Sequence, residues 1–381
     1  LLLQSTLPVN VTYAQALAAT PTKGLRHGLI HANTPTDHAN DEMARLQRDW
    51  GVSPTNASPI KFHRRTKYMD AEITALLQKV KDAKRTPFWQ STPAQAREGP
   101  MLMDLLFGAA PDVARVEDFS ITSSDGHALP VRLYVPQKQP RGLIVYFHGG
   151  GWVIGSVAAY HPLTATLAVR TGCAVLSVDY RLAPEHPFPL PLEDAISALK
   201  WSAEHADARL GSSFERLIVM GDSAGGNLAT VAARLHNGTV AARPVDLQIL
   251  AYPVTAHDFS TESYESFAED HLLTRRDMMW FWDQYLPDPA KRDDPLASPL
   301  ATPDLAGSPA ALILSAGCDP LRDEGEAYGR RLLESGVYAD IVRCDGLLHG
   351  FLSMINYAPS ASQAFDRILA AVKQSLTDSS T

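Results

Sequence analysis

The stretch Leu217-Ile-Val-Met-Gly-Asp-Ser-Ala-Gly-Gly-Asn227 decides how the rest of this chain is interpreted. Its apolar residues predict a buried strand that ends at Gly221, and a helix-like segment follows the glycines. Ser223 lies between them in a G-x-S-x-G pattern, where a sharp turn presents a serine hydroxyl above the edge of a sheet. The close backbone approach in such a turn requires small residues on both sides of the serine. Ordinary glycine-rich turns also show this pattern, so the remaining chain has to distinguish the two interpretations.

The pattern outside this stretch predicts an α/β fold whose sheet is mostly parallel. Two strands joined by the turn residues Ser124-Asp125-Gly126 come first, at 113–121 and 129–135. Further along, helical stretches separate continuous apolar runs, which lie at 143–147, 174–178, 217–220, 247–251, 311–315 and 339–342. Continuous apolar strands connected by helices are typical of a parallel sheet with helices on both faces.

Helices are also predicted before the first strand. The segment 70–83 is amphipathic, with Asp70 as its expected N-cap. A second helix is expected to begin at Thr92-Pro93, and an apolar run at 101–107 follows. These short helices need an apolar surface to cover.

The interval 252–309 interrupts the alternation, because it contains no strand-like run. An insertion here would lie beyond the carboxyl ends of the strands, where open α/β sheets bind ligands. Its apolar segment 272–285 is interpreted either as a lid helix that lines an apolar pocket or as plain hydrophobic packing. Trp280 and Trp282 in this segment, together with Trp152, are the candidate substrate-binding residues.

A nucleophilic serine needs a base and a group that orients the base. Enzymes that carry the serine on a strand–turn–helix have the chain order Ser, Asp or Glu, His. The chain has 13 histidines, but only His349 follows the last strand-end aspartate, Asp319. We therefore predict His349 as the base, the alternative being a surface-loop histidine.

Two aspartates compete for the role of the orienting acid. Asp319 directly follows the apolar run 311–316, whereas Asp323 opens the helical stretch 323–333 and is explained as its N-cap. Asp319 is the predicted acid for this reason. Asp222, next to the serine, is interpreted as a turn residue.

The glycine-rich segment Phe147-His-Gly-Gly-Gly-Trp152 follows a predicted strand and is the candidate oxyanion hole. Consecutive glycines let a loop bring bare N–H groups against a substrate carbonyl, and the N–H of Ala224 would add to them. Such a loop could instead hold phosphate. The phosphate-binding patterns G-x-G-x-x-G and G-x-x-x-x-G-K-[ST] do not occur at this segment.

Composition and charge narrow the class of partner. The chain has 381 residues, of which 45% are hydrophobic, and a net charge of −8. An acidic balance argues against nucleic acid and anionic membrane surfaces as main partners, and there is no transmembrane run. The three cysteines, Cys173, Cys318 and Cys344, form no C-x-x-C pair and are expected to be free buried thiols.

The first 66 residues are polar, irregular and rich in proline, and we expect an extension over the surface or part of a lid. His27, His31 and His38 lack the thiols or carboxylates that would complete a metal site, so no metal is predicted. The segment 1–20 contains Ala14-Gln15-Ala16 but no basic start, which favours a trimmed start over the tail of a secretory signal. We therefore expect a cytoplasmic protein, with a secreted or periplasmic one as the alternative.

Five motifs in this order resemble the bacterial esterases of the hormone-sensitive lipase family. They are His148–Trp152, Asp179–Pro189, Gly221–Gly225, Asp319–Glu324 and His349–Phe351. The resemblance implies an α/β-hydrolase fold with a helical cap and hydrolysis of short- to medium-chain carboxylic esters without a cofactor.

The same resemblance implies roles for individual residues and a division of the chain. It makes the N–H groups of Gly150, Gly151 and Ala224 the oxyanion hole, while Asp179 and Glu185 would brace nearby loops. The expected segments are an extension at 1–66, cap helices at 67–110, a first core part at 111–252, a cap insertion at 253–309 and a second core part at 310–381. The long extension departs from the family.

The sequence thus predicts a serine carboxylesterase that uses Ser223, Asp319 and His349 on a small-molecule ester. Cleavage of an amide, thioester or polyester by the same residues remains open, because specificity depends on pocket shape. A silent hydrolase fold that only binds small molecules is a third interpretation, although such proteins usually lose the base or the nucleophile. A homodimer is one assembly compatible with the sequence.

Overall fold

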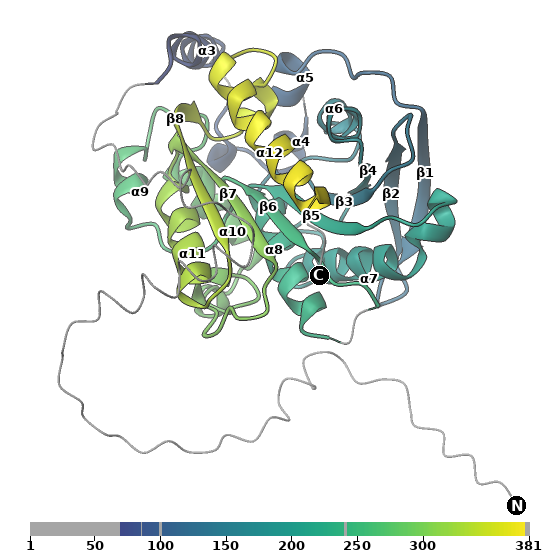
Figure 1. Cartoon of the computed structure of the whole chain (residues 1–381). Coiled ribbons are helices and arrows are strands. Elements are labelled where there is room, and N and C mark those ends of the chain that lie inside the picture. The colour runs from purple at the N-terminus through teal and green to yellow at the C-terminus, as the bar shows by residue number, and fades with distance from the viewer. Residues whose placement is uncertain (1–68, 85, 99–100, 240–241, 378–381) are drawn as a thin grey trace, which may run out of the picture. The chain divides into compact units, whose positions relative to one another are not determined.

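A computed structural model describes residues 69–84, 86–98, 101–239 and 242–377 (Figure 1). The predicted extension at 1–66, with His27, His31 and His38, lies outside these residues. The described chain forms an eight-stranded sheet in the order β1-β2-β4-β3-β5-β6-β7-β8. Its strands are β1 (Arg115–Thr122), β2 (Ala128–Val135), β3 (Gly142–Phe147), β4 (Ala174–Val178), β5 (Arg216–Asp222), β6 (Leu247–Ala251), β7 (Ala310–Cys318) and β8 (Ala339–Leu348).

The sheet is parallel from β4 through β3, β5, β6 and β7 to β8, whereas β2 pairs antiparallel with both of its neighbours, β1 and β4. All predicted strands are present, which confirms the predicted α/β fold. β8 is longer than its apolar run because it continues along β7 past an irregularity between Ala316 and Cys318.

Alternate residues of the central strands pack on opposite faces, as the pleat of a strand requires. In β3, Leu143, Val145 and Phe147 face one apolar core, whereas Ile144 and Tyr146 face the other. The first core is covered by α7 (Leu190–Leu210), α8 (Ala224–Asn237) and α11 (Arg322–Glu334). The second is covered by α6 (His161–Thr171) and α12 (Pro359–Thr377), which lie on the other side of the sheet in Figure 1.

The helices predicted before the first strand are α3 (Ala71–Asp82), α4 (Pro93–Arg97) and α5 (Leu102–Leu106), with the 3₁₀ turn η2 (Phe88–Gln90) between α3 and α4. α4 begins at Pro93, as predicted, and Thr92 caps it in a capping box with Gln95. Asp70 is at the N-cap position of α3, but its side chain makes no capping hydrogen bond.

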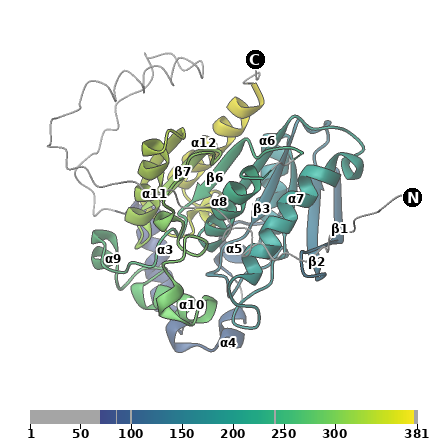
Figure 2. The same ribbon diagram turned by 90° about the horizontal axis from the view of Figure 1, so that it is seen from below.

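The interval 252–309 contains α9 (Glu262–Ser266), α10 (Arg275–Tyr285) and the 3₁₀ turns η3 (Pro289–Lys291) and η4 (Pro299–Ala301), and no strand. Figure 2 shows α4 and α10 on the same side of the sheet. A further 3₁₀ turn, η5 (Phe351–Met354), precedes α12. The exact division into core and cap segments stays a prediction.

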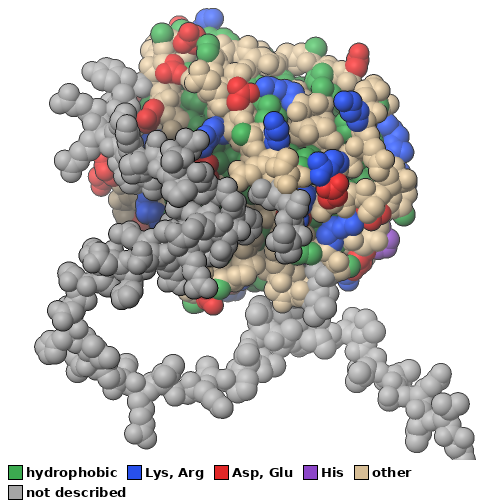
Figure 3. Space-filling model, viewed as in Figure 1, with side chains coloured by type: hydrophobic (Ala, Val, Ile, Leu, Met, Phe, Trp, Pro, Cys, Tyr) green, Lys and Arg blue, Asp and Glu red, His purple; other side chains and the backbone are tan. Residues whose placement is uncertain are grey.

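The distribution of charged side chains and the state of the cysteines can be compared with what the composition predicts. On the face seen in Figure 3, basic and acidic side chains are interspersed rather than gathered by sign. No helix in the described part of the chain is both long and apolar enough to cross a membrane. All three cysteines are free, as predicted, and Cys344 alone is only partly buried.

Candidate active site

Ser223 stands on a strained turn between β5 and α8. Its backbone has φ +54° and ψ −122°, a region that side-chain-bearing residues rarely adopt. A Cβ at Gly221 would collide with the carbonyl of Gly225, and one at Gly225 with the carbonyl of Phe147. The N–H of Ser223 donates to the carbonyl of Ala251 on β6 at 2.9 Å, which fixes the turn to the sheet. The two glycines of the motif are therefore required by space.

His349 and Asp319 meet Ser223 at the carboxyl ends of the strands. His349 Nε2 lies 3.0 Å from Ser223 Oγ, and its Nδ1 lies 2.7 Å from Asp319 Oδ2. Asp319 follows β7 and is fully buried, and its Oδ1 accepts the N–H of Leu321 at 2.9 Å. With Nδ1 protonated, Nε2 is free to accept the serine proton.

Tyr252 supports the imidazole from the end of β6. Its ring packs edge-on against the ring of His349, with centroids 4.7 Å apart, and also against Phe351. The residue has φ +37°, and its N–H donates to the carbonyl of Leu314 on β7 at 2.6 Å. The orientation of His349 is thus fixed by a carboxylate on one side and an aromatic ring on another.

The glycine-rich loop after β3 is anchored by Asp222, the residue before the serine. Asp222 Oδ1 accepts the N–H of Gly149 at 2.9 Å and the hydroxyl of Tyr146 at 2.6 Å, while Oδ2 accepts the hydroxyl of Tyr160 at 3.1 Å. Burial raises the pKa of Asp222, and the hydrogen bond from Tyr146 opposes that rise. Asp222 is the last residue of β5, and its buried carboxylate anchors the glycine-rich loop. The interpretation of Asp222 as a turn residue did not include this role.

Three backbone N–H groups around the serine are available as donors. Among the hydrogen bonds of the described residues, none uses the N–H of Gly150, Gly151 or Ala224. Ala224 is the first residue of α8, so its N–H is one of those that a helix leaves without a partner. The positive end of the helix dipole lies at the same place.

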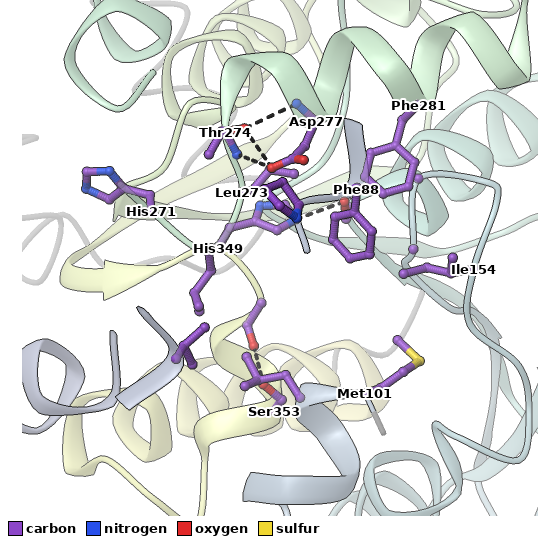
Figure 4. A pocket seen from close by; sticks show the side chains of 18 of the residues that line it. Phe88, Met101, Ile154, His271, Leu273, Thr274, Asp277, Phe281, His349 and Ser353 are labelled. Carbon is purple, nitrogen blue, oxygen red and sulfur yellow. Dashed lines mark hydrogen bonds between the residues drawn. The ribbon is translucent and has the colours of Figure 1, made fainter. Parts of the chain in front are cut away.

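A cavity of about 740 Å³ opens above Ser223 and His349 (Figure 4). Beyond Ser223 and its neighbours, its walls come mainly from the segment from α3 to α5, the loop after β3, the interval from 269 to 281, and the segment from 349 to 353. Most of the lining is apolar, including Phe88, Met101, Ile154, Met278 and Phe281. The volume lies within the range of sites that enclose a small organic molecule.

The three tryptophans predicted to bind substrate do not line this cavity. Trp152 and Trp282 are fully buried, and Trp152 stacks on Tyr285 with centroids 4.0 Å apart. Trp280 is partly buried and packs against Phe88 and Phe281. The phase of α10 is the reason, because it turns Met278 and Phe281 toward the cavity and Trp282 and Tyr285 into the core. Both interpretations of segment 272–285 therefore hold, each for a different face.

The N-cap interpretation of Asp323 is wrong, because α11 already begins at Arg322 with Leu321 as N-cap. Asp323 Oδ2 accepts the N–H of Ser263 on α9 at 2.8 Å, and Oδ1 accepts from Arg322. Its carboxylate is thus occupied by other groups, whereas that of Asp319 faces His349.

The loops around the site are braced by further charged groups. Asp179 Oδ1 accepts the N–H of Val157 at 3.0 Å. Arg97 on α4 binds both carboxylate oxygens of Glu185 and lowers the pKa of Glu185 to about 2. No group of three or more His, Cys, Asp or Glu suited to a metal ion occurs among the described residues.

Tyr252 and Phe88 are site residues that the sequence did not reveal, whereas Asp277 and Phe281 lie in the segment 272–285 that was interpreted as a possible pocket-lining helix. Tyr252 directly follows a predicted strand, which is a weak signal for a position at the sheet edge. Phe88 lies after Pro87 in a short segment without periodicity, so nothing in the sequence pointed to its position beside α10.

Known proteins share this fold and much of this sequence. A family model described as the alpha/beta hydrolase fold matches residues 144–353. An ethyl acetate hydrolase of Pseudomonas putida is 39% identical over 276 residues, which cover 71% of this chain and 86% of that protein. An arylesterase of Saccharolobus solfataricus is 33% identical over 288 residues, covering 74% and 92%. The crystal structure of a thermostable esterase from Pseudomonas putida matches with a TM-score of 0.75 and 33% identity, covering 82% of this chain and 99% of that one.

Proposed function

Because the chain belongs to the hormone-sensitive lipase family of α/β-hydrolases and is a carboxylic ester hydrolase, we propose that Ser223, His349 and Asp319 perform the hydrolysis. The observation that carries this proposal is the continuous line of contacts Ser223 Oγ–His349 Nε2, at 3.0 Å, and His349 Nδ1–Asp319 Oδ2, at 2.7 Å. The expected order of these groups along the chain adds support.

In the first half of the reaction, His349 Nε2 takes the proton of Ser223 Oγ as this oxygen bonds to the ester carbonyl carbon. Asp319 accepts the Nδ1–H and stabilises the imidazolium that forms. His349 then gives the proton to the departing alcohol oxygen as the carbon–oxygen bond breaks. The acyl group remains on Ser223.

In the second half, a water molecule replaces the alcohol. His349 takes one proton from the water while its oxygen attacks the acyl carbon, and returns that proton to Ser223 Oγ as the acid leaves. In both halves the negative charge on the carbonyl oxygen would be met by the N–H groups of Gly150, Gly151 and Ala224. Each such donor contributes about 3–4 kcal/mol of transition-state stabilisation.

We further propose short- to medium-chain esters as substrates. A relative that covers most of this chain is named for ethyl acetate, which is a short ester. The cavity of about 740 Å³ leaves room for a longer acyl or alcohol group as well.

Hydrolysis of p-nitrophenyl esters from acetate to palmitate tests both parts of the proposal. We expect a maximum at short or medium chains, and loss of turnover in Ser223→Ala to about one millionth of the wild-type kcat. Ser213→Ala is the matched control, because this exposed serine pairs with Asp207 outside the cavity. Turnover by Ser223→Ala at the wild-type rate would refute the nucleophile, and a maximum at palmitate would refute the chain-length preference.

A further inference from the structure

One wall of the cavity lies directly against the proposed oxyanion hole. A Cβ at Gly151 would overlap the ring of Phe281, so this ring lies on the backbone that donates the oxyanion N–H. Gly151 also has φ +58°, which favours glycine independently of space. A substrate whose carbonyl oxygen reaches Gly151 therefore has one of its two substituents close to Phe281.

Phe281 does not form this wall alone. The ring of Phe88, from η2, packs against it with centroids 5.2 Å apart, and both rings line the cavity. Figure 4 shows the two residues, together with His349, among the side chains that line the cavity. The two residues come from segments that are distant in the chain, so something has to hold η2 against α10.

Asp277 on α10 makes that connection. Its side chain is 3% exposed, and Oδ1 accepts the N–H of Trp89, the neighbour of Phe88, at 3.3 Å. Oδ2 accepts the N–H and the hydroxyl of Thr274, at 3.1 and 2.6 Å, in the capping box of α10. One buried carboxylate thus caps α10 and binds η2 to it. The guanidinium of Arg276 adds a second connection, 4.9 Å from the ring centroid of Trp89.

We propose that Phe88 and Phe281 limit the size of the substrate group beside the oxyanion hole, and that Asp277 is the positioning residue that holds Phe88 in this wall. The inference rests on the proposed site at Ser223 and adds the residues that determine its selectivity. Removing either ring opens space for a branched or aromatic substituent, whereas removing Asp277 releases η2 and lets the Phe88 ring move away.

Selectivity is the readout that distinguishes this role from a purely structural one. The test measures kcat/KM for p-nitrophenyl acetate and pivalate, which differ in the acyl group, and for ethyl and benzyl butyrate, which differ in the alcohol. One of the two ester series, acyl or alcohol, varies the group that lies against Phe88 and Phe281. In that series we expect the ratio of kcat/KM for the bulky ester to kcat/KM for the compact ester to rise about tenfold or more in Phe281→Ala and Phe88→Ala. Asp277→Ala should raise the same ratio about three- to tenfold.

Asp283→Ala is the matched control, since Asp283 lies on the same helix, is exposed and pairs with Arg292 outside the cavity. Its ratio should equal that of the wild type, with folding of every variant checked by thermal melting. If Asp277→Ala does not fold, Asp277→Ser replaces it, because serine is common at helix N-termini but too short to bridge to Trp89.

Equal ratios in wild type and all variants, in both ester series, would overturn the size limit. A change in the ring variants but not at Asp277 would overturn the positioning role. A failure of the proposed function would be seen in a different measurement. An active Ser223→Ala would refute Ser223 as the nucleophile, while the selectivity ratios of the other variants could still be measured.

Discussion

The two aspartates next to the reacting groups differ in what they face. Among the described residues, the side chain of Asp319 makes hydrogen bonds with His349 and with the N–H of Leu321, so its charge is directed at the imidazole. Asp222 accepts hydrogen bonds from three tyrosine hydroxyls, those of Tyr146, Tyr160 and Tyr252, and from the N–H of Gly149, so its carboxylate holds the glycine-rich loop after β3 in place. One carboxylate thus orients the imidazole of His349, and the other anchors the glycine-rich loop after β3.

Replacing Asp319 by Asn should lower kcat by about 10³- to 10⁴-fold, because an amide does not stabilise the imidazolium or the required tautomer. Steady-state kinetics on p-nitrophenyl butyrate measures the loss. Asp323→Asn tests the competing acid and should keep kcat within about threefold of wild type. The assignment is reversed if Asp323→Asn is the inactive variant.

At the scale of elements, the first turn of α11 ties the acid-bearing loop to the segment that follows β6. Glu324 is buried there, and its Oε1 accepts the N–H groups of Thr255 and Ala256 at 2.7 and 3.2 Å. Burial raises the pKa of Glu324 well above its usual value. In the pH range between its unfolded and folded pKa, the folded state keeps a proton that the unfolded state has lost.

The wild type therefore loses stability as the pH rises through this range, by about 1.4 kcal/mol per pH unit. Glu324→Gln keeps an oxygen that can accept from the same N–H groups and carries no titrating proton. We expect its melting temperature, relative to wild type, to increase from pH 4 to pH 8. A difference in melting temperature between Glu324→Gln and wild type that stays constant from pH 4 to pH 8 would contradict this prediction. Glu265→Gln, an exposed change on α9, is the control for which a constant difference is expected.

The elements were predictable from the sequence where local pattern and tertiary packing agree. Apolar runs such as 174–178 became strands because both faces of the sheet are covered. The orientation of α10 was not predictable in this way. Aromatic residues occur on several sides of this helix, so the sequence does not show which side faces the cavity. The packing of Trp282 on Trp152 and of Phe281 on Phe88 decides which aromatic side chains line the cavity.

At the scale of the whole molecule, Arg97 connects the segment before the first strand to the loops that follow β3 and β4. Its Nε donates to the carbonyl of Val153, just after the oxyanion glycines, and its Nη2 to the carbonyl of Ala183, both at 2.8 Å. The same guanidinium binds Glu185 with two nitrogens, at 2.9 and 2.7 Å. A planar fork can satisfy all of these acceptors at once.

Arg97→Lys should destabilise the protein by about 2–3 kcal/mol, since an ammonium reaches fewer of these acceptors and leaves buried carbonyls without a donor. Chemical unfolding measures the change, and kcat/KM should fall with it because Val153 adjoins the oxyanion loop. Arg115→Lys alters a partly exposed pairing with Glu117, which the ammonium can still make, and should cost under about 1 kcal/mol. Equal losses in the two variants would show that Arg97 is only another surface arginine.

The sequence predicted Ser223, His349 and Asp319 because their order along the chain is a strict criterion that few residues meet. It did not predict the walls of the site, which depend on contacts between segments such as Trp89–Asp277 and Arg97–Val153. Such contacts join residues with no shared local pattern. The residues that select the substrate were therefore less predictable from the sequence than the residues proposed to react with it.

The cavity draws its walls from residues as far apart along the chain as Val80 and Ser353. Closing loops of this length costs entropy before any contact compensates for it, and contacts between distant residues slow folding. A refolding chain thus regains strands and helices before it encloses the cavity. The recovery of ester hydrolysis therefore reports on the last steps of refolding. It should be slower than the recovery of the far-ultraviolet circular dichroism signal, which reports on strands and helices.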